Sequence, residues 1–212
     1  MVQKHILIFL AIFLSLLFES SLANHNSQTK TYIESSCNGT LYPNLCIRCL
    51  NKFSHSTVKG PQHLAQLALS VSLSRALQTR VYLLNVAKEL KTTDHNNKRM
   101  YLTVQDCVNQ INDSVDQLSQ AIKELKKLNQ FSTVINDKVL WHISNVETWV
   151  STALTDASSC VQSFPGRRMS KRVATIKVRA KNVAEVTSNA LALFQSYASR
   201  YKLAAAGTTK KP

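Results

Sequence analysis

The sequence predicts an all-α protein, an up-down-up-down four-helix bundle preceded by a disulfide-closed helical hairpin at the N-terminus. Glycine and proline number only four each among 212 residues, too few for an all-β protein with many tight turns. Four long segments space their apolar residues three and four apart, as one buried face of an α-helix requires. The connections between these segments are short, which favours antiparallel neighbours.

The four bundle segments span about residues 61–206. The first starts at Gly60-Pro61, with proline in the first helical turn, and runs to about Thr92. The second follows the polar loop 93–99, the third covers about 137–163, and the fourth follows Pro165-Gly166. The expected buried residues are, in chain order, Leu64, Leu67, Val71, Ser74, Leu77, Val81 and Leu84; Val104, Val108, Ile111, Val115, Leu118, Ile122 and Leu125; Val139, Ile143, Val146, Val150, Ala153 and Ala157; and Val173, Ile176, Ala180, Val183, Ala190, Phe194 and Tyr197.

Residues 1–23 read as a secretory signal peptide. Lys4 provides a basic start, Ile6 to Phe18 is an apolar run, and Ser21-Leu22-Ala23 offers the small residues of a cleavage site. The run is too short to span a bilayer, which takes about 20 residues, and no later stretch is apolar enough. We therefore expect a secreted protein whose single domain covers residues 24–212, with no membrane span.

In a secreted protein the five cysteines should pair and leave one over. Cys37 and Cys46 flank a turn with Gly39 and Pro43, so a local bridge can form between them. Cys107 and Cys160 would lie at the same height in adjacent antiparallel helices. Cys49 is then left over, either as a competitor for Cys37 or as a buried, inert thiol. A zinc site at Cys46 and Cys49 lacks a second pair of ligands.

The hairpin, about residues 29–53, consists of two helices too short to be stable alone, so it should lie against the bundle. Its turn contains an N-glycosylation sequon at Asn38, and a second sequon at Asn112 falls within a helix. Asn38 is the better acceptor because it lies on a loop.

The third bundle segment combines a buried stripe with a row of hydroxyl groups on its opposite side. Steps of three and four residues place Thr148, Ser151, Thr152 and Thr155 there. We name these four residues the hydroxyl face. It is free to contact a partner, although hydroxyl groups on a helix are usually only solvated.

No catalytic or cofactor motif is present. The histidines are scattered, and neither H-E-x-x-H, nor G-x-S-x-G, nor a phosphate-binding glycine loop occurs. Acidic residues such as Asp106, Asp113 and Glu124 are expected on outward positions.

The formal net charge is +14. Secretion argues against nucleic acid as the partner, so this charge indicates a solvated surface, an acidic polysaccharide or an enzyme that acts on one. Its cations cluster at Arg167, Arg168, Lys171, Arg172, Lys177, Arg179 and Lys181, and at Lys123, Lys126 and Lys127.

Several segments resemble a known family. They read S-S-C-N-G-T-L-Y-P-N-L-C at 35–46, P-Q-H-L-A-Q-L-A-L-S-V-S-L at 61–73, D-C at 106–107, D-S-V-D-Q-L at 113–118 and V-E-T-W-V-S-T-A-L-T-D-A-S-S-C at 146–160. Together they resemble the plant invertase and pectin methylesterase inhibitor family across the whole mature chain. The resemblance implies a secreted, non-catalytic bundle that forms a one-to-one complex with a cell-wall enzyme. It also implies that Cys37–Cys46 holds the hairpin and that Cys107–Cys160 joins the second and third bundle helices. Cys49 is an addition to this pattern, which leaves a free thiol or a covalent dimer open.

The family has two main targets, and the sequence favours one of them. The run T-W-V-S-T-A-L-T-D at 148–156 is similar to members directed at pectin methylesterase, and residues 128–137 lack the Pro-Lys-Phe often found in members directed at acid invertase. The resemblance implies that exposed helix faces cover the esterase's substrate cleft, which makes the hydroxyl face the candidate contact. We expect an inhibitor of pectin methylesterase in the apoplast or cell wall, without metal or cofactor. The alternatives are an acid invertase inhibitor and a basic wall protein that binds acidic pectin.

Overall fold

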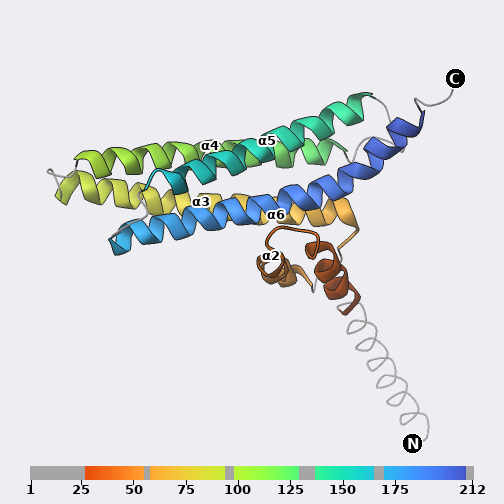
Figure 1. Ribbon diagram of the computed structural model, residues 1–212, viewed down its shortest axis with the longest axis horizontal. Helices are drawn as coiled ribbons and strands as arrows, with labels where there is room; N and C mark the ends of the chain where they lie inside the picture. Colours follow the sequence, from red (N-terminus) through yellow and green to blue (C-terminus); the bar gives the residue numbers. More distant parts are fainter. Residues whose placement is uncertain (1–26, 55–57, 94–97, 129–136, 165–169, 209–212) are drawn as a thin grey trace, which may run out of the picture.

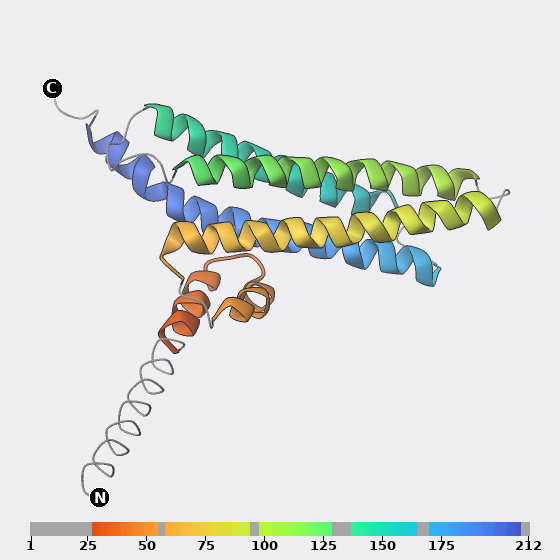
Figure 2. The ribbon, with the colours of Figure 1, turned by 180° about the vertical axis from the view of Figure 1, so that it is seen from behind.

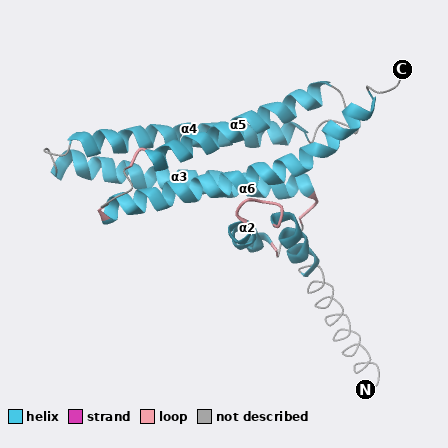
Figure 3. Cartoon of the chain, in the orientation of Figure 1, coloured by secondary structure: helices cyan, strands magenta, loops and turns pink. Residues whose placement is uncertain are grey.

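The computed structural model of the chain describes residues 27–54, 58–93, 98–128, 137–164 and 170–208. The regular elements in these ranges are all helices, with no strand among them (Figure 3). The predicted signal peptide, residues 1–23, lies outside the described residues, as do Arg167 and Arg168 of the basic cluster. Within the described ranges, none of the helices has the length and apolarity needed to cross a membrane.

A short helical hairpin precedes four long helices (Figure 1). Residues 27–37 are helical, and after a turn the chain forms α2 (Pro43–Leu50) and the 3-10 helix η1 (Asn51–Phe53). The long helices are α3 (Pro61–Thr93), α4 (Lys98–Leu128), α5 (Asp137–Gln162) and α6 (Lys171–Thr208).

The four long helices form an antiparallel bundle. Each packs against the one before it, and α6 returns to pack against α3 (Figures 1 and 2). This order confirms the predicted up-down-up-down topology. It places α3 and α5 at opposite corners, so their outward faces lie on different sides of the molecule.

A glycine immediately before α3 starts this helix. Gly60 has φ of +112°, a conformation that residues with a Cβ rarely adopt. Its carbonyl accepts a hydrogen bond of 3.0 Å from the backbone N–H of Leu64 and so closes the first helical turn. Pro61 then occupies the first helical position, where its missing N–H costs nothing.

Most of the buried residues are those predicted from the spacing of large apolar residues. The residues predicted for α5 and α6 are all buried, and of those predicted for α4 only Ile122 remains partly exposed. Phe164, just after α5, adds a large side chain that is only 2% exposed. Burial of these stripes against one another is the main force that holds the bundle together.

The stripe predicted for α3 is wrong. Of its seven residues only Leu64 is buried, and Val81 and Leu84 are 56% and 48% exposed. The side of α3 that faces the core is built largely from small and hydroxyl residues, which carry little hydrophobic signal of their own. Its members are Leu64, Ala65, Ala68, Leu69, Ser72, Ala76, Thr79, Leu83, Val86, Ala87 and Leu90.

Glu124 also departs from expectation. We expected it on an outward position of α4, but it is only 2% exposed. Its carboxylate accepts hydrogen bonds from Asn145 of α5 and from the Nζ of Lys127, and it pairs with the Nδ1 of His142. A buried carboxylate is tolerated here because several donors replace the water that it loses.

Two disulfides join the cysteine pairs that the sequence predicts. Cys37 and Cys46 close the hairpin, and Cys107 and Cys160 join α4 to α5 with their Cα atoms 4.6 Å apart. Cys49 is a free cysteine and is buried.

The hairpin packs against one side of the bundle, where α2 contacts both α3 and α6 (Figure 2). A buried asparagine of α6 holds its turn. The side chain of Asn189 accepts a hydrogen bond of 3.0 Å from the N–H of Tyr42 and donates one of 2.9 Å to the carbonyl of the same residue. Such a paired contact fixes the hairpin in register against α6.

Candidate functional site

The hydroxyl face lies on the outer side of α5. Thr148, Ser151, Thr152 and Thr155 are all exposed, whereas the apolar residues on the other side of the same helix are buried. The face extends along about two helical turns, or roughly 11 Å. It is therefore a straight, accessible surface on a helix that is fixed from behind.

The three threonines of the face have their hydroxyl groups anchored to the helix. Each donates a hydrogen bond of 2.9–3.0 Å to the carbonyl four residues earlier. With the hydroxyl hydrogens used in this way, the oxygen atoms remain as acceptors. The anchored side chains also have little rotamer freedom to lose when a partner binds.

A shallow groove runs beside the hydroxyl face toward α6. It is lined by the four hydroxyl residues, by Glu147 of α5 and by Gln195 of α6. The Nζ of Lys202 on α6 lies 2.8 Å from each carboxylate oxygen of Glu147, so an ion pair between the two helices borders the groove. A partner that fills this groove would contact both helices.

Contacts between α4 and α5 hold the helix that carries this face. The hydroxyl of Ser114 donates a hydrogen bond of 3.0 Å to the carbonyl of Ala153, directly behind the face. The Cys107–Cys160 bridge lies beyond one end of the face and the cluster around Glu124 beyond the other. Covalent and hydrogen-bonded contacts thus attach α5 to α4 behind the hydroxyl face and beyond both of its ends.

The surroundings of the Glu124 carboxyl favour its charged form. Burial raises its pKa, but the hydrogen bonds from Lys127, His142 and Asn145 outweigh this effect, and its pKa lies below the ordinary value. The charged carboxylate is consequently the form that the folded protein stabilises.

The surroundings of Asp156, next to the hydroxyl face, instead disfavour the charged form of its carboxyl. Burial, and secondarily the charge of Asp113 on α4, raise its pKa above the ordinary value. Its buried Oδ2 has no hydrogen-bond partner among the described residues. The charged form of this carboxyl is therefore a source of instability.

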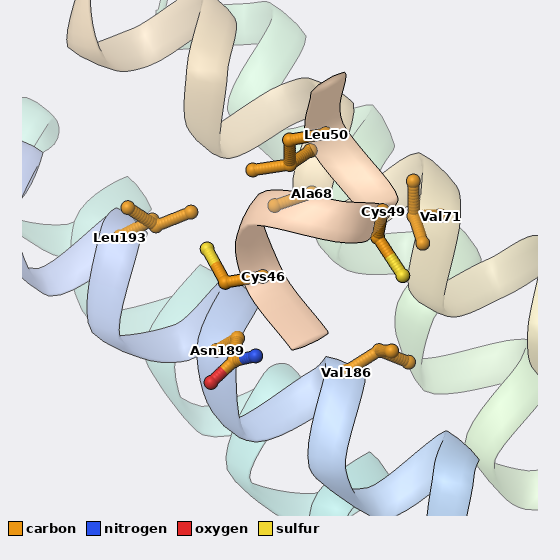
Figure 4. Close-up of a pocket in the computed structure, with 8 residues that line it drawn as sticks. All are labelled: Cys46, Cys49, Leu50, Ala68, Val71, Val186, Asn189 and Leu193. Carbon is orange, nitrogen blue, oxygen red and sulfur yellow. The ribbon is translucent and has the colours of Figure 1, made fainter. Parts of the chain in front are cut away.

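Cys49 occupies a small cavity between the hairpin and the bundle (Figure 4). Its sulfur is directed toward Val71 and Val186, whereas the sulfur of Cys46 points to the other side of α2. The cavity holds about 10 Å³, at most the space of one water molecule. This position disfavours exchange with the neighbouring disulfide. Cys49 also lines the wider groove between the hairpin and α3.

No group of three or more His, Cys, Asp or Glu side chains in the described ranges could hold a metal ion. The two described histidines serve structural contacts. Nδ1 of His63 accepts a hydrogen bond from the backbone N–H of Lys59, and His142 pairs with Glu124. His25, His55 and His95 lie outside the described residues.

Sequence reasoning missed two of these structural residues, Glu124 and Asn189. Each is a polar residue next to a buried position of an apolar stripe, which is the one local signal that could have identified them. Apart from Lys127, which follows Glu124 on α4, their partners lie in other helices or in the hairpin, at sequence separations from 18 to 147 residues. A single-helix pattern cannot locate such partners.

Comparison with known proteins supports one family. The family model described as plant invertase/pectin methylesterase inhibitor matches residues 31–193. "Pectinesterase inhibitor 9" from Arabidopsis thaliana is 40% identical over 91% of this chain and 94% of its own length. "Pectinesterase inhibitor 11" from the same plant is 34% identical over 92% of this chain and 98% of its own length.

A solved structure agrees on the fold. The crystal structure of a mutant form of a pectin methylesterase inhibitor from Arabidopsis matches 75% of this chain and 92% of its own, with a TM-score of 0.59 at 21% sequence identity. At that identity the likeness concerns the fold alone. The extent of the family match and the identity to the two relatives confirm the resemblance seen in the sequence, and the chain therefore belongs to the plant invertase/pectin methylesterase inhibitor family.

Proposed function

We propose that this protein is a secreted, non-catalytic inhibitor of pectin methylesterase that acts in the plant cell wall. The observation that carries the proposal is the similarity along nearly the whole chain to two proteins named as pectinesterase inhibitors. No comparable observation favours acid invertase as the target.

The mechanism would be steric. The hydroxyl face and its groove would lie over the substrate cleft of the esterase in a one-to-one complex and keep the pectin chain out. The anchored threonines and the fixed position of α5 support this role, because a rigid surface loses less conformational entropy on binding. The acceptor oxygens on this face would pair with donor groups in the enzyme.

The proposal includes processing of the chain. Removal of the signal peptide after Ala23 would leave a mature domain of residues 24–212. Asn38 is exposed on the hairpin turn and is the better acceptor for N-glycosylation, whereas Asn112 is half-buried on α4. N-terminal sequencing of the secreted protein should begin at Asn24, and a different start would place the cleavage site elsewhere.

The direct test is titration of the purified mature protein into two assays, plant pectin methylesterase and plant acid invertase. We expect loss of esterase activity that saturates near one inhibitor per enzyme, with invertase unaffected. Loss of invertase activity alone would overturn the proposal, as would no response from several esterases.

A matched pair of variants tests the contact face. The variant Thr148→Gln/Thr152→Gln enlarges two side chains on the hydroxyl face and should weaken inhibition at least tenfold, which corresponds to about 1.4 kcal/mol. The control Thr92→Gln/Thr103→Gln changes two threonines with the same hydrogen bond to the carbonyl four residues earlier, on α3 and α4. Equal inhibition by the two variants would show that the enzyme does not contact the hydroxyl face.

A further inference from the structure

Charge is divided unequally between the two halves of the bundle. α3 and α6 together carry eleven Lys and Arg residues and two acidic residues. α4 and α5 together carry six Lys and Arg residues and seven acidic residues. Because α3 and α6 pack side by side, almost the entire positive excess of the bundle lies on one side of the molecule (Figure 2).

A groove between the hairpin and α3 concentrates part of this charge. Lys52 of η1 and Arg75 of α3 both line it, together with Phe53, Ser74 and Gln78, and its volume is about 250 Å³. Neither cation has an ion-pair partner among the described residues. The groove therefore offers two uncompensated charges beside a hydroxyl group, an amide and an aromatic ring.

The positive charge continues from this groove along the line where α3 meets α6. The guanidinium of Arg179 lies 4.5 Å from the ring centre of Tyr82, two helical turns or about 10.5 Å along α3 from Arg75. Further on, Arg172 pairs with Glu89 at 3.1 Å, and Lys171 is exposed beside it. We name the row Lys52, Arg75, Arg179, Arg172 and Lys171 the basic seam.

We propose that the basic seam binds de-esterified pectin, a linear polymer of uronic acid residues that carries carboxylates at regular intervals. The inference rests on the proposed function, because the target enzyme would produce this polymer from its methyl ester. Single exposed ion pairs are weak, so a row of separated cations retains a ligand only when that ligand spans several of them. The hydroxyl, amide and aromatic groups of the groove suit a sugar ring next to each carboxylate.

The seam and the hydroxyl face can be occupied together. α3 and α5 lie at opposite corners of the bundle. On the shared helix α6 the seam uses residues 171–179, whereas the groove beside the hydroxyl face uses Gln195 and is bordered by Lys202. A pectin chain on the seam therefore leaves the outer face of α5 open. Bound polymer would hold the inhibitor close to the enzyme that generates the carboxylates. Such tethering raises the effective concentration of the inhibitor at the sites where de-esterification has begun.

The test compares the binding of the mature protein to polygalacturonate and to the same polymer after full methyl-esterification, by isothermal titration calorimetry. We expect binding to polygalacturonate that weakens as salt is added, and at least tenfold weaker binding to the ester. Equal affinity for both polymers would overturn the proposal. Equally tight binding of double-stranded DNA through the same seam would overturn the assignment to a uronate polymer.

Two variants with the same loss of charge locate the site. Lys52→Gln/Arg75→Gln/Arg179→Gln removes three cations of the seam and should lower affinity for polygalacturonate at least tenfold. Lys123→Gln/Lys126→Gln/Lys138→Gln removes three exposed cations from α4 and α5 and should change it less than twofold. An equal loss in both would show that only net charge matters and would refute the seam.

The same variants separate this inference from the proposed function. In the esterase titration with a small soluble ester as substrate, both should inhibit as well as the wild type, because neither alters the hydroxyl face. Wild-type protein that inhibits the esterase but does not bind polygalacturonate would refute the seam alone. Wild-type protein that binds the polymer without inhibiting would refute the proposed function alone.

Discussion

Removal of the Cys107–Cys160 bridge should destabilise the protein more than removal of Cys37–Cys46. The first bridge closes a loop of 53 residues and the second a loop of 9. In the chain-entropy model these loops correspond to about 4 and about 2.5 kcal/mol of stability at 25 °C. Because a folded domain is stable by only about 5–15 kcal/mol, either loss is a large fraction of the total.

The variants are Cys107→Ala/Cys160→Ala and Cys37→Ala/Cys46→Ala. Alanine is preferred to serine because all four cysteines are at most 3% exposed, and a buried hydroxyl without a partner would add a separate cost. For a chain of this length, about 2–4 °C per kcal/mol predicts that the melting temperature falls by about 8–16 °C in the first variant and about 5–10 °C in the second.

Thermal and urea unfolding followed by circular dichroism measure these losses, and the esterase titration measures inhibition in parallel. The first variant should also inhibit less well, since α5 loses its covalent attachment to α4. A larger loss of stability in the hairpin variant would refute the loop-entropy reasoning. Unchanged inhibition in a clearly destabilised bundle variant would show that inhibition does not need a rigid α5.

Three further predictions concern buried polar groups. Glu124→Gln should lower the free energy of unfolding by about 1–3 kcal/mol at neutral pH. This loss should vanish in acid. Because its pKa is lowered in the folded protein, Glu124 stabilises the fold above its ordinary pKa, and this contribution is lost as the pH falls through the lowered pKa. Asp156→Asn should raise the melting temperature at neutral pH but not below about pH 3.9. Because the pKa of Asp156 is raised in the folded protein, its carboxyl destabilises the fold as the pH rises through that pKa and the group becomes charged. Unfolding curves across pH check both signs. Asn189→Ala should cost about 1–3 kcal/mol and accelerate hydrogen exchange at Tyr42; unchanged exchange would mean that the hairpin is held by other contacts.

The sequence predicted all four long helices, but it predicted the buried side correctly only where large apolar residues fall on one side of the helix. In α4 and α5 residues such as Ile111 and Ile143 recur with helical spacing between polar residues, so the buried side is unambiguous. In α3, apolar residues occur on all sides of the helix, so the sequence offers two apolar stripes that could face the core. The core takes the stripe with Ala68 and Ala76, whose small side chains let the helices approach closely.

The hairpin explains part of the error on α3. It packs over the outer side of this helix, so that Val71 is partly buried against Cys49 of α2. A periodic pattern records how often apolar residues recur, but it does not identify what covers them. The second covering element is encoded elsewhere in the chain, in residues 27–53.

The hydroxyl face was predictable because exposure of one side of α5 follows directly from burial of the other. Its surroundings were not. The groove requires Gln195 of α6, and its border requires the ion pair between Glu147 and Lys202, which lie 55 residues apart. Likewise, a buried carboxylate such as Glu124 is plausible only once His142 and Asn145 are known to face it from the next helix.

The two proposed surfaces differ in physical character, and this difference provides a way to separate them. The four residues of the hydroxyl face carry no charge, so enzyme binding there should depend on shape and hydrogen bonds and change little with ionic strength. The basic seam acts through exposed charges, whose interactions are screened within about 8 Å at physiological salt. Rising salt should therefore release the protein from polygalacturonate before it relieves inhibition of the esterase. If both interactions weaken in parallel, the enzyme must also bind through the basic side of the bundle, and the division of roles between α5 and the seam fails.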